Sequence, residues 1–200
     1  MTLILQQILF LLLVYFVSSI PFGLLFGKIF ANTDLRKHGS GNIGATNATR
    51  VLGKKLGLLT LILDGAKGGL MLIVARFSFS DINHLHLYLT VVAFVAIIGH
   101  IYPVYLNFKG GKGVATALAT ILALNFTSGL LALCFWILTF VFCRISAVAS
   151  LVAIFSTIVT AYSYNAPIEE LILNSLIFTI ILARHKENIT RMIIGEEKKL

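Results

Sequence analysis

Long apolar runs, separated by short polar segments, define the pattern of this chain. A bilayer core about 30 Å thick requires about 20 apolar residues of helix, and several runs approach or exceed that length. We therefore predict an all-α, polytopic membrane protein whose first span is kinked by Pro21. The predicted spans are 3–30, 56–75, 87–108, 147–162 and 171–183, and a further apolar run covers 114–143.

The run 114–143 is too long for one ordinary span. As a single helix it would be about 45 Å long, and a polar sequence at 125–129 lies near its middle. We interpret the run as two short helices in a hairpin, which brings the predicted number of transmembrane helices to seven. The alternative is one strongly tilted helix.

Composition and charge add an orientation to this pattern. Of the 200 residues, 58% are hydrophobic and 12% are charged, against about 25% charged in ordinary globular proteins, so residues 1–200 are predicted to form a single membrane domain. The net charge of +8 favours membrane lipids over nucleic acid as partners. With seven spans, the basic residues outside the spans fall on one side, except for Arg76. The positive-inside rule then places the N-terminus in the periplasm and the C-terminus in the cytoplasm. With six spans, Arg144 and the C-terminal residues would lie on the outer side, and the excess of basic residues on one side would be lost.

The first polar segment, residues 37–50, combines glycine, hydroxyl, amide and cationic side chains. Glycines adopt positive φ cheaply, so successive N–H groups can turn toward an anion. We expect a helix to start near Ala45, and its N-terminus also favours anions. A planar guanidinium binds phosphate well. The predicted phosphate-binding residues here are Gly39, Ser40, Gly41, Asn42, Thr46, Asn47 and Arg50. The alternative is a glycine-rich connector beside the membrane.

Two later segments have similar chemistry. The second polar segment, Lys109-Gly110-Gly111-Lys112-Gly113, lacks the spacing of a P-loop. It nevertheless offers backbone N–H groups and two ammonium groups at the start of a predicted helix. A basic turn that only sets topology is the alternative. The third polar segment, residues 184–191, begins at Arg184 and places His185 and Asn188 on one helical face.

His185 has two possible roles within the third polar segment. Its imidazole could act as a general base or as a hydrogen-bond donor to phosphate. A solvated histidine at the membrane surface is the alternative interpretation. The sequence by itself leaves these open.

The remaining charged residues do not suggest a second chemistry. In the second span, Asp64 and Lys67 have the i, i+3 spacing of an ion pair, for which we predict a structural role. No set of His, Cys, Asp and Glu has metal-ligand spacing, so no metal is expected. Ser40 lacks the context of a nucleophile elbow. The acidic residues predicted to be solvated are Asp34, Glu187, Glu196 and Glu197.

Together these features predict two phosphate-binding segments at the cytoplasmic face, above apolar helices. That arrangement suits a reaction between a water-soluble phosphate and a lipid-like partner. A transporter of small organic phosphates is the rival class, but transporters usually carry ionisable groups near the bilayer midplane and often have inverted repeats. A lipid-binding scaffold without catalysis is the third possibility.

Three motifs carry a resemblance to a known family. They are Asp-Leu-Arg-x-x-Gly-Ser-Gly-Asn-Ile-Gly-Ala-Thr-Asn-x-Thr-Arg at 34–50, Gly-His-x-Tyr-Pro-Val with Phe-Lys-Gly-Gly-Lys-Gly-Val-Ala-Thr within 99–116, and Arg-His-x-Glu-Asn-Ile-x-Arg at 184–191. In order and spacing they resemble the signature motifs of the bacterial acyl-phosphate:glycerol-3-phosphate acyltransferases, the PlsY family. The resemblance covers the chain.

The resemblance implies a seven-helix protein of the bacterial inner membrane. It would transfer a fatty acyl group from acyl phosphate to the 1-hydroxyl of sn-glycerol 3-phosphate, giving lysophosphatidic acid and phosphate. Because acyl phosphate is already activated, no coenzyme A, other cofactor or metal is expected. A monomer is compatible with this chemistry. By motif position, the residues expected to act in catalysis and glycerol-phosphate binding are Ser40, Arg50, Lys112, His185 and Asn188, and the expected acyl-phosphate loop is Gly110, Gly111 and Gly113. Either His185 or the leaving phosphate would accept the hydroxyl proton.

Overall fold

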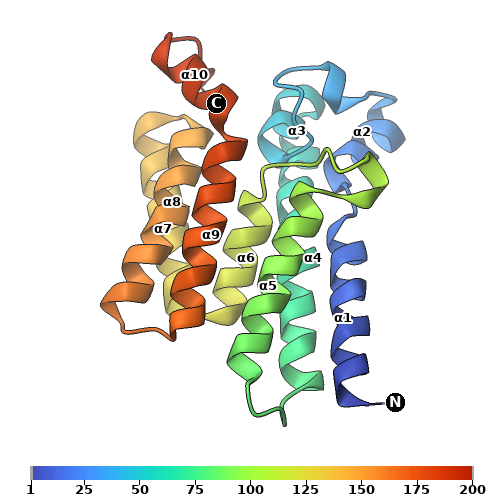
Figure 1. The fold of residues 1–200 in the computed structure, drawn as a ribbon. Coiled ribbons are helices and arrows are strands. Elements are labelled where there is room, and N and C mark those ends of the chain that lie inside the picture. The colour runs from blue at the N-terminus through green and yellow to red at the C-terminus, as the bar shows by residue number, and fades with distance from the viewer. Residues whose placement is uncertain (1, 200) are drawn as a thin grey trace.

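The apolar runs fold into a bundle of helices, and the segments 37–50, 109–113 and 184–191 lie toward the same end of it (Figure 1). A computed structural model describes residues 2–199, and within that range it contains helices and no strands. Its elements are α1 (Leu3–Ser18), α2 (Phe22–Ala31), η1 (Leu35–Lys37), α3 (Ala45–Leu52), α4 (Lys54–Ser78), α5 (Leu85–Ile101), η2 (Val104–Leu106), α6 (Val114–Leu124), α7 (Phe126–Cys143), α8 (Ser146–Ser163), α9 (Ile168–Arg184) and α10 (Lys186–Ile193).

Five stretches of the described chain are long and apolar enough to cross a membrane. They are Leu3–Ala31, Lys54–Ser78, Leu85–Leu106, Phe126–Cys143 and Ser146–Ser163. Large apolar side chains such as Phe142, which is 83% exposed, cover the outside of the bundle, as expected where lipid replaces water as the solvent. The predicted all-α membrane fold is therefore confirmed. Helices α6 and α9 have 11 and 17 residues, and a count of seven spans stays a prediction.

The first predicted span is broken, not kinked. Helix α1 ends at Ser18, and Pro21 stands at the N-cap of α2, because proline has no N–H to continue the helix. Lys67 on α4 donates from Nζ to the carbonyl of Ile20 at 2.7 Å and to Asp64 Oδ1 at 2.8 Å. The predicted Asp64–Lys67 pair is thus present and buried, and it also satisfies a carbonyl at the break between α1 and α2.

The predicted hairpin in 114–143 is confirmed, with its break at Asn125. The Asn125 side chain accepts a hydrogen bond from the N–H of Ser128 and so caps α7. Its Nδ2 donates to Glu170 Oε1 of α9 at 3.0 Å. A Cβ on Gly129 would collide with the backbone of Leu122, so only glycine lets the two helices approach this closely.

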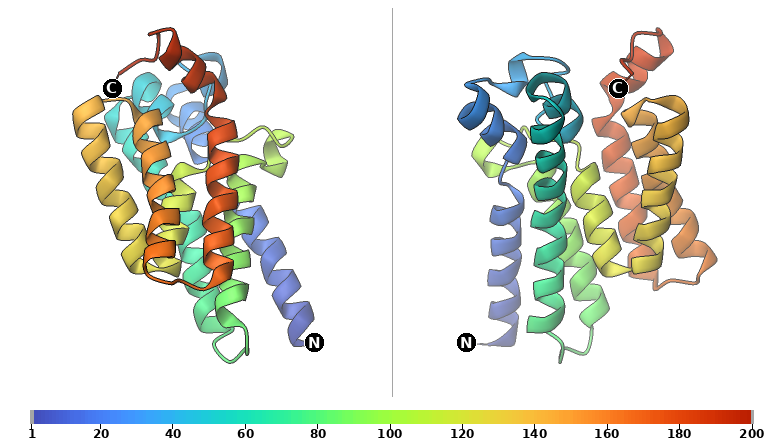
Figure 2. Two further views of the ribbon diagram at one scale, coloured as in Figure 1. Left: turned by 60° about the vertical axis from the view of Figure 1, so that its left-hand side comes forward. Right: turned by 180° about the vertical axis from the view of Figure 1, so that it is seen from behind.

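The helices form two groups, as Figure 2 shows from two further directions. Helices α1, α4 and α5 lie together on one side, α7, α8 and α9 on the other, and α6 between them. The core contains buried side chains from both groups, including Leu72, Val92, Ile154 and Ile177. Helices α2, α3 and α10 lie at one end of both groups, which brings residues far apart in sequence over the same end of the bundle.

Candidate active site

The three polar segments meet around one cavity of about 340 Å³. The cavity is lined by all five residues expected to act in catalysis, namely Ser40, Arg50, Lys112, His185 and Asn188. Asn42, Thr46, Asn47 and Gly113 line it as well, whereas Gly39, Gly41, Lys109, Gly110, Gly111 and Arg184 do not. The five residues expected to act in catalysis therefore share one cavity, whereas part of the predicted binding set does not line it.

Asn47 holds the first polar segment in shape. Its Nδ2 donates to the carbonyls of Leu35, His38 and Asn42 at 3.2, 3.0 and 2.8 Å. Its Oδ1 accepts from the N–H of Ser40 at 2.9 Å. The amide is 1% exposed, and these contacts use its donors and its acceptor on the loop itself. Asn47 lies at the cavity, but its polar atoms serve the loop.

The glycines of this segment serve the same purpose. Gly39 and Gly41 have φ of +63° and +71°, the left-handed region that favours glycine. A Cβ on Gly39 would overlap Asn47 Oδ1. Gly39 therefore lets the loop approach Asn47, Gly41 provides a second left-handed position in the loop, and neither lines the cavity.

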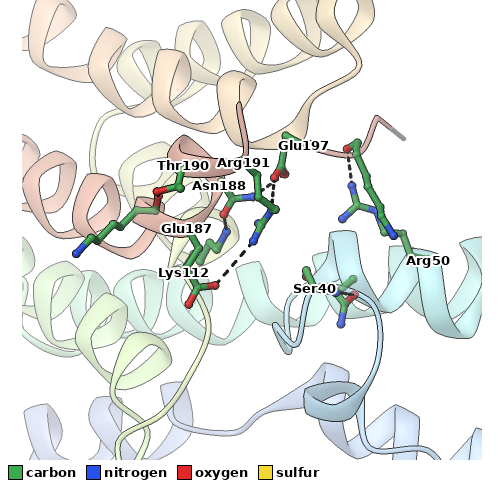
Figure 3. Close-up of polar contacts among 11 residues, drawn as sticks. Ser40, Arg50, Lys112, Glu187, Asn188, Thr190, Arg191 and Glu197 are labelled. Atoms are coloured by element: carbon green, nitrogen blue, oxygen red, sulfur yellow. Dashed lines mark hydrogen bonds and ion pairs between the residues drawn. The ribbon is translucent and has the colours of Figure 1, made fainter. Parts of the chain in front are cut away.

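The other side chains of the segment point along the cavity wall. Thr46 Oγ1 lies 3.0 Å from Ser146 Oγ on α8, which links α3 to the second helix group. Arg50, in the last turn of α3, donates from Nη2 to the carbonyl of Lys198 at 2.7 Å. Figure 3 shows Ser40 and Arg50 on the side of the site opposite Lys112.

The second polar segment presents its lysine, not its backbone, to the cavity. We expected free N–H groups here, and this was wrong for Gly110 and Gly111: their N–H groups donate to the carbonyls of Ile101 and His100 at 3.1 and 3.2 Å. These bonds fold the segment back onto the end of α5. Only Lys112 and Gly113 of the segment line the cavity, and Gly113, with φ of +87°, precedes the first residue of α6.

Lys112 is a partly buried cation. Its Nζ donates to Asn188 Oδ1 of α10. Burial lowers the pKa of Lys112 from its usual value to about 8, and the charge of Glu197 opposes that shift. The ammonium form, which prevails below that pH, suits a phosphate or a developing oxyanion.

His185 stands at the junction of α9 and α10, facing the cavity. Its Nδ1 lies 2.8 Å from the carbonyl oxygen of Ile181. Because a carbonyl only accepts hydrogen bonds, Nδ1 carries the proton and Nε2 keeps its lone pair. Burial, together with the charge of Lys112, lowers the pKa of His185 to about 4. The imidazole is thus neutral at pH 7, with Nε2 able to accept a hydrogen bond.

Arg184 supports the second polar segment from behind. Its Nη2 donates to the carbonyl of Gly110 at 3.0 Å, and its guanidinium lies 5.9 Å from the centre of the Tyr102 ring. It thus fastens the segment to α9 and does not line the cavity.

Two acidic residues are not solvated as predicted. Asp34 pairs with Arg36 at 2.6 Å, and this hydrogen bond holds the pKa of Asp34 well below its usual range. Glu197 has a side chain only 6% exposed and lines the cavity. Its charged sequence neighbourhood gives no signal of burial, because the contacts arise only when the C-terminal tail folds back. Glu187, with a side chain 86% exposed, and Glu196 are exposed as expected.

The rest of the cavity wall includes apolar residues that the sequence did not single out. Leu61 of α4, Leu118 of α6 and Leu133, Trp136 and Ile137 of α7 line it. Trp136 is held in place by a hydrogen bond from Nε1 to Ser150 Oγ at 3.2 Å and by a ring stacked on Phe140 at 4.9 Å. Asp64 and His100 form part of the same wall. One cavity therefore offers cationic and apolar walls together.

Comparisons with known proteins identify the family of this chain. The sequence model described as glycerol-3-phosphate acyltransferase matches residues 8–195. The chain belongs to the glycerol-3-phosphate acyltransferase family. A member from Macrococcus caseolyticus (strain JCSC5402) is 43% identical over 98% of this chain and 97% of its own. A member from Anaeromyxobacter sp. (strain K) is 41% identical over 93% of each chain.

Solved structures agree with this family assignment. The crystal structure of PlsY (YgiH), an integral membrane glycerol 3-phosphate acyltransferase, in its glycerol 3-phosphate form has a TM-score of 0.90 and 37% identity over 98% of this chain and 96% of that one. The lysophosphatidic acid form has a TM-score of 0.87 and 35% identity, covering 98% and 95%. The resemblance found from the three motifs is thereby confirmed, and this chain is a multi-pass membrane acyltransferase.

Proposed function

We propose that this acyltransferase moves a fatty acyl group from acyl phosphate to the 1-hydroxyl of sn-glycerol 3-phosphate. The products are lysophosphatidic acid and inorganic phosphate, in the first step of phospholipid synthesis. The observation that carries the proposal is the single cavity with Arg50 and Lys112 on polar walls and Leu133 and Trp136 on an apolar wall. A phosphate and an acyl chain can be held there within reach of each other.

The reaction needs positioning and charge stabilisation more than a covalent intermediate. The substrate hydroxyl oxygen attacks the acyl carbon, the bond from that carbon to the phosphate oxygen breaks, and phosphate leaves. Arg50 and Lys112 stabilise the oxyanion and the leaving phosphate. Ser40 and Asn188 orient the glycerol phosphate through hydrogen bonds.

The proton of the attacking hydroxyl goes to one of two acceptors. His185 Nε2 is free to accept a hydrogen bond from that hydroxyl, but a pKa of about 4 makes it a weak base. The leaving phosphate is more basic and takes the proton at the end of the step. In this scheme His185 orients the hydroxyl. Asn42, Thr46 and the backbone of Gly113 complete the substrate contacts, while Gly39, Gly41, Asn47, Gly110, Gly111 and Arg184 hold the polar segments in shape.

We also propose that the chain forms one domain with seven spans in the bacterial inner membrane, with its active site and C-terminus in the cytoplasm. The distribution of basic residues supports this orientation, and the site lies at the end of the bundle away from the N-terminus (Figure 1). Reporter fusions at the C-terminus test it, and a periplasmic C-terminus would refute it.

Phosphate release from palmitoyl phosphate, with and without glycerol 3-phosphate, tests the reaction directly in detergent. Turnover that requires both substrates supports acyl transfer, because neither a transporter nor a lipid-binding scaffold turns over in detergent. His185→Ala then separates the two proton acceptors. Retained kcat with a raised KM for glycerol 3-phosphate fits an orienting imidazole, whereas complete loss of turnover would make His185 the base.

A further inference from the structure

The C-terminal tail, residues 195–199, folds back over the candidate site. The N–H groups of Glu196 and Glu197 both donate to the carbonyl of Arg191, at 2.7 and 3.2 Å. On the other side, Arg50 donates to the carbonyl of Lys198 at 2.7 Å. The tail is therefore held between α10 and α3, as Figure 3 shows.

The carboxylate of Glu197 is the buried end of this tail. Its Oε1 accepts from Asn188 Nδ2 at 2.6 Å, and its Oε2 accepts from Arg191 Nε at 2.7 Å. Hydrogen bonds to an ionised group are about twice as strong as neutral ones. With only 6% of its side chain exposed, Glu197 is a fixed element of the site and not a solvated tail charge.

This carboxylate determines which way the Asn188 amide faces. A side-chain amide has a donor side and an acceptor side. With Nδ2 bound to Glu197, Oδ1 faces Lys112 and accepts from its ammonium group. The flipped amide would place its oxygen against the carboxylate and its NH2 against the ammonium, which is unfavourable at both ends.

We infer that Glu197 is a positioning residue for the proposed acyl transfer, orienting Asn188 and, through it, the Lys112 ammonium that faces the substrate phosphate. The inference rests on the proposed function but adds a residue to it. A chain of contacts runs from Arg191 to Glu197, Asn188 and Lys112 (Figure 3). Its effect is to hold a flexible lysine in one place, which reduces the entropy lost when substrate binds.

Glu197 also acts on Lys112 through its charge. The charged and titratable groups around Lys112 are Arg184, His185, Glu187, Arg191 and Glu197 on the α9 and α10 side, and Arg50, Asp64 and His100 on the other cavity walls. Among them, Glu197 makes the largest contribution that raises the pKa of Lys112. Removal of its charge should therefore leave Lys112 easier to deprotonate.

Glu197→Gln tests both effects, and Glu196→Gln is the matched control. The control removes the same charge from an exposed neighbour on the same tail. For E197Q we expect kcat/KM in the phosphate-release assay to fall on the order of 10- to 100-fold, as for other small displacements of catalytic groups. We also expect the alkaline limb of its pH profile to move to lower pH. E196Q should keep the wild-type rate and profile.

Glu197→Asp separates geometry from charge. It keeps the negative charge but shortens the side chain by one methylene, so it should lose rate while the alkaline limb stays in place. If E197Q does not fold, as judged by gel filtration and melting in detergent, Arg191→Gln replaces it. That change removes one of the two contacts of the Glu197 carboxylate and should lower kcat/KM in the same direction.

Two results would overturn the inference. A rate and pH profile of E197Q equal to those of E196Q would show that Asn188 and Lys112 need no help from the tail. A lower KM for glycerol 3-phosphate in E197Q would mean that the carboxylate competes with substrate phosphate for this place. Both leave the proposed function intact, whereas a wild-type protein without phosphate release would refute the function and the inference together.

Discussion

Asn47→Ala is the sharpest test of how the first polar segment is built. The change removes the amide that donates to three loop carbonyls and accepts from the N–H of Ser40. Every one of these partners belongs to residues 35–42. Loss of the amide should therefore change the conformation of this loop, which places Ser40 at the cavity. The packing of the helix bundle should stay the same.

The size of the effect follows from the hydrogen bonds that this amide can make. Its NH2 group has two hydrogens shared among three carbonyls, and its oxygen accepts one more bond, which amounts to about three full hydrogen bonds. At a net value of about 1 kcal/mol each, their loss favours the open loop by about 3 kcal/mol. Since about 1.4 kcal/mol corresponds to a factor of ten, an effect confined to substrate binding and positioning would be about 10². Because water can partly replace the lost contacts, we expect kcat/KM to fall by about 10- to 10²-fold.

The assay is phosphate release in detergent, with melting temperature measured on the same samples. The control is Asn83→Ala, which changes an exposed asparagine in the connector between α4 and α5, at the other end of the molecule. We expect N47A to lose activity while its melting temperature stays close to that of N83A. If N47A keeps kcat/KM within about threefold of the wild type, the loop does not depend on this amide and the reasoning is refuted.

Three further predictions follow from other contacts. Activity should fall as pH rises through about 8, because the Lys112 ammonium is lost there, and Lys112→Arg should move that alkaline limb upward even if it lowers the rate. Glu170→Ala should destabilise the protein by about 1–3 kcal/mol, measured by thermal unfolding in detergent, because it leaves Asn125 Nδ2 without its acceptor at the turn between α6 and α7; an unchanged melting temperature would contradict this. Arg184→Ala should raise the KM for acyl phosphate by loosening the carbonyl contact at Gly110, and an equal fall in kcat with unchanged KM would count against it.

The apolar pattern predicts the helices well because the position of each helix is determined by residues close together in the sequence. The break at Asn125 could be placed because a polar stretch interrupts a run too long for one span. Pro21 marked the end of α1 for a similar reason, but a full break and not a kink resulted. At this break Lys67, which lies on another helix, binds the carbonyl of Ile20. A contact between distant segments is invisible in a local pattern.

At the site, too, features that depend on nearby residues could be predicted, and features that depend on distant contacts could not. Arg50, Lys112 and His185 could be selected because their side chains suit a phosphate and their motifs are compact. The N–H groups of Gly110 and Gly111 were assigned wrongly, since their partners at the end of α5 depend on how the segment folds back. Glu197 was missed because nothing in an acidic and basic tail distinguishes the one carboxylate that becomes buried.

The short helix α6 explains why polar and apolar walls meet in this cavity. Its 11 residues span about 16 Å, roughly half of a 30 Å hydrocarbon core. A helix of that length cannot have both ends at the membrane surface, so at least one connection must lie deeper in the bundle. At one end, Asn125 Nδ2 donates a hydrogen bond to Glu170 Oε1. At the other end, Lys112 is partly buried and shares its cavity with Leu118 and Leu133. A full-length helix would carry its lysine out to water and away from the apolar wall, whereas the short helix places a cation where a phosphate and an acyl chain can be held side by side.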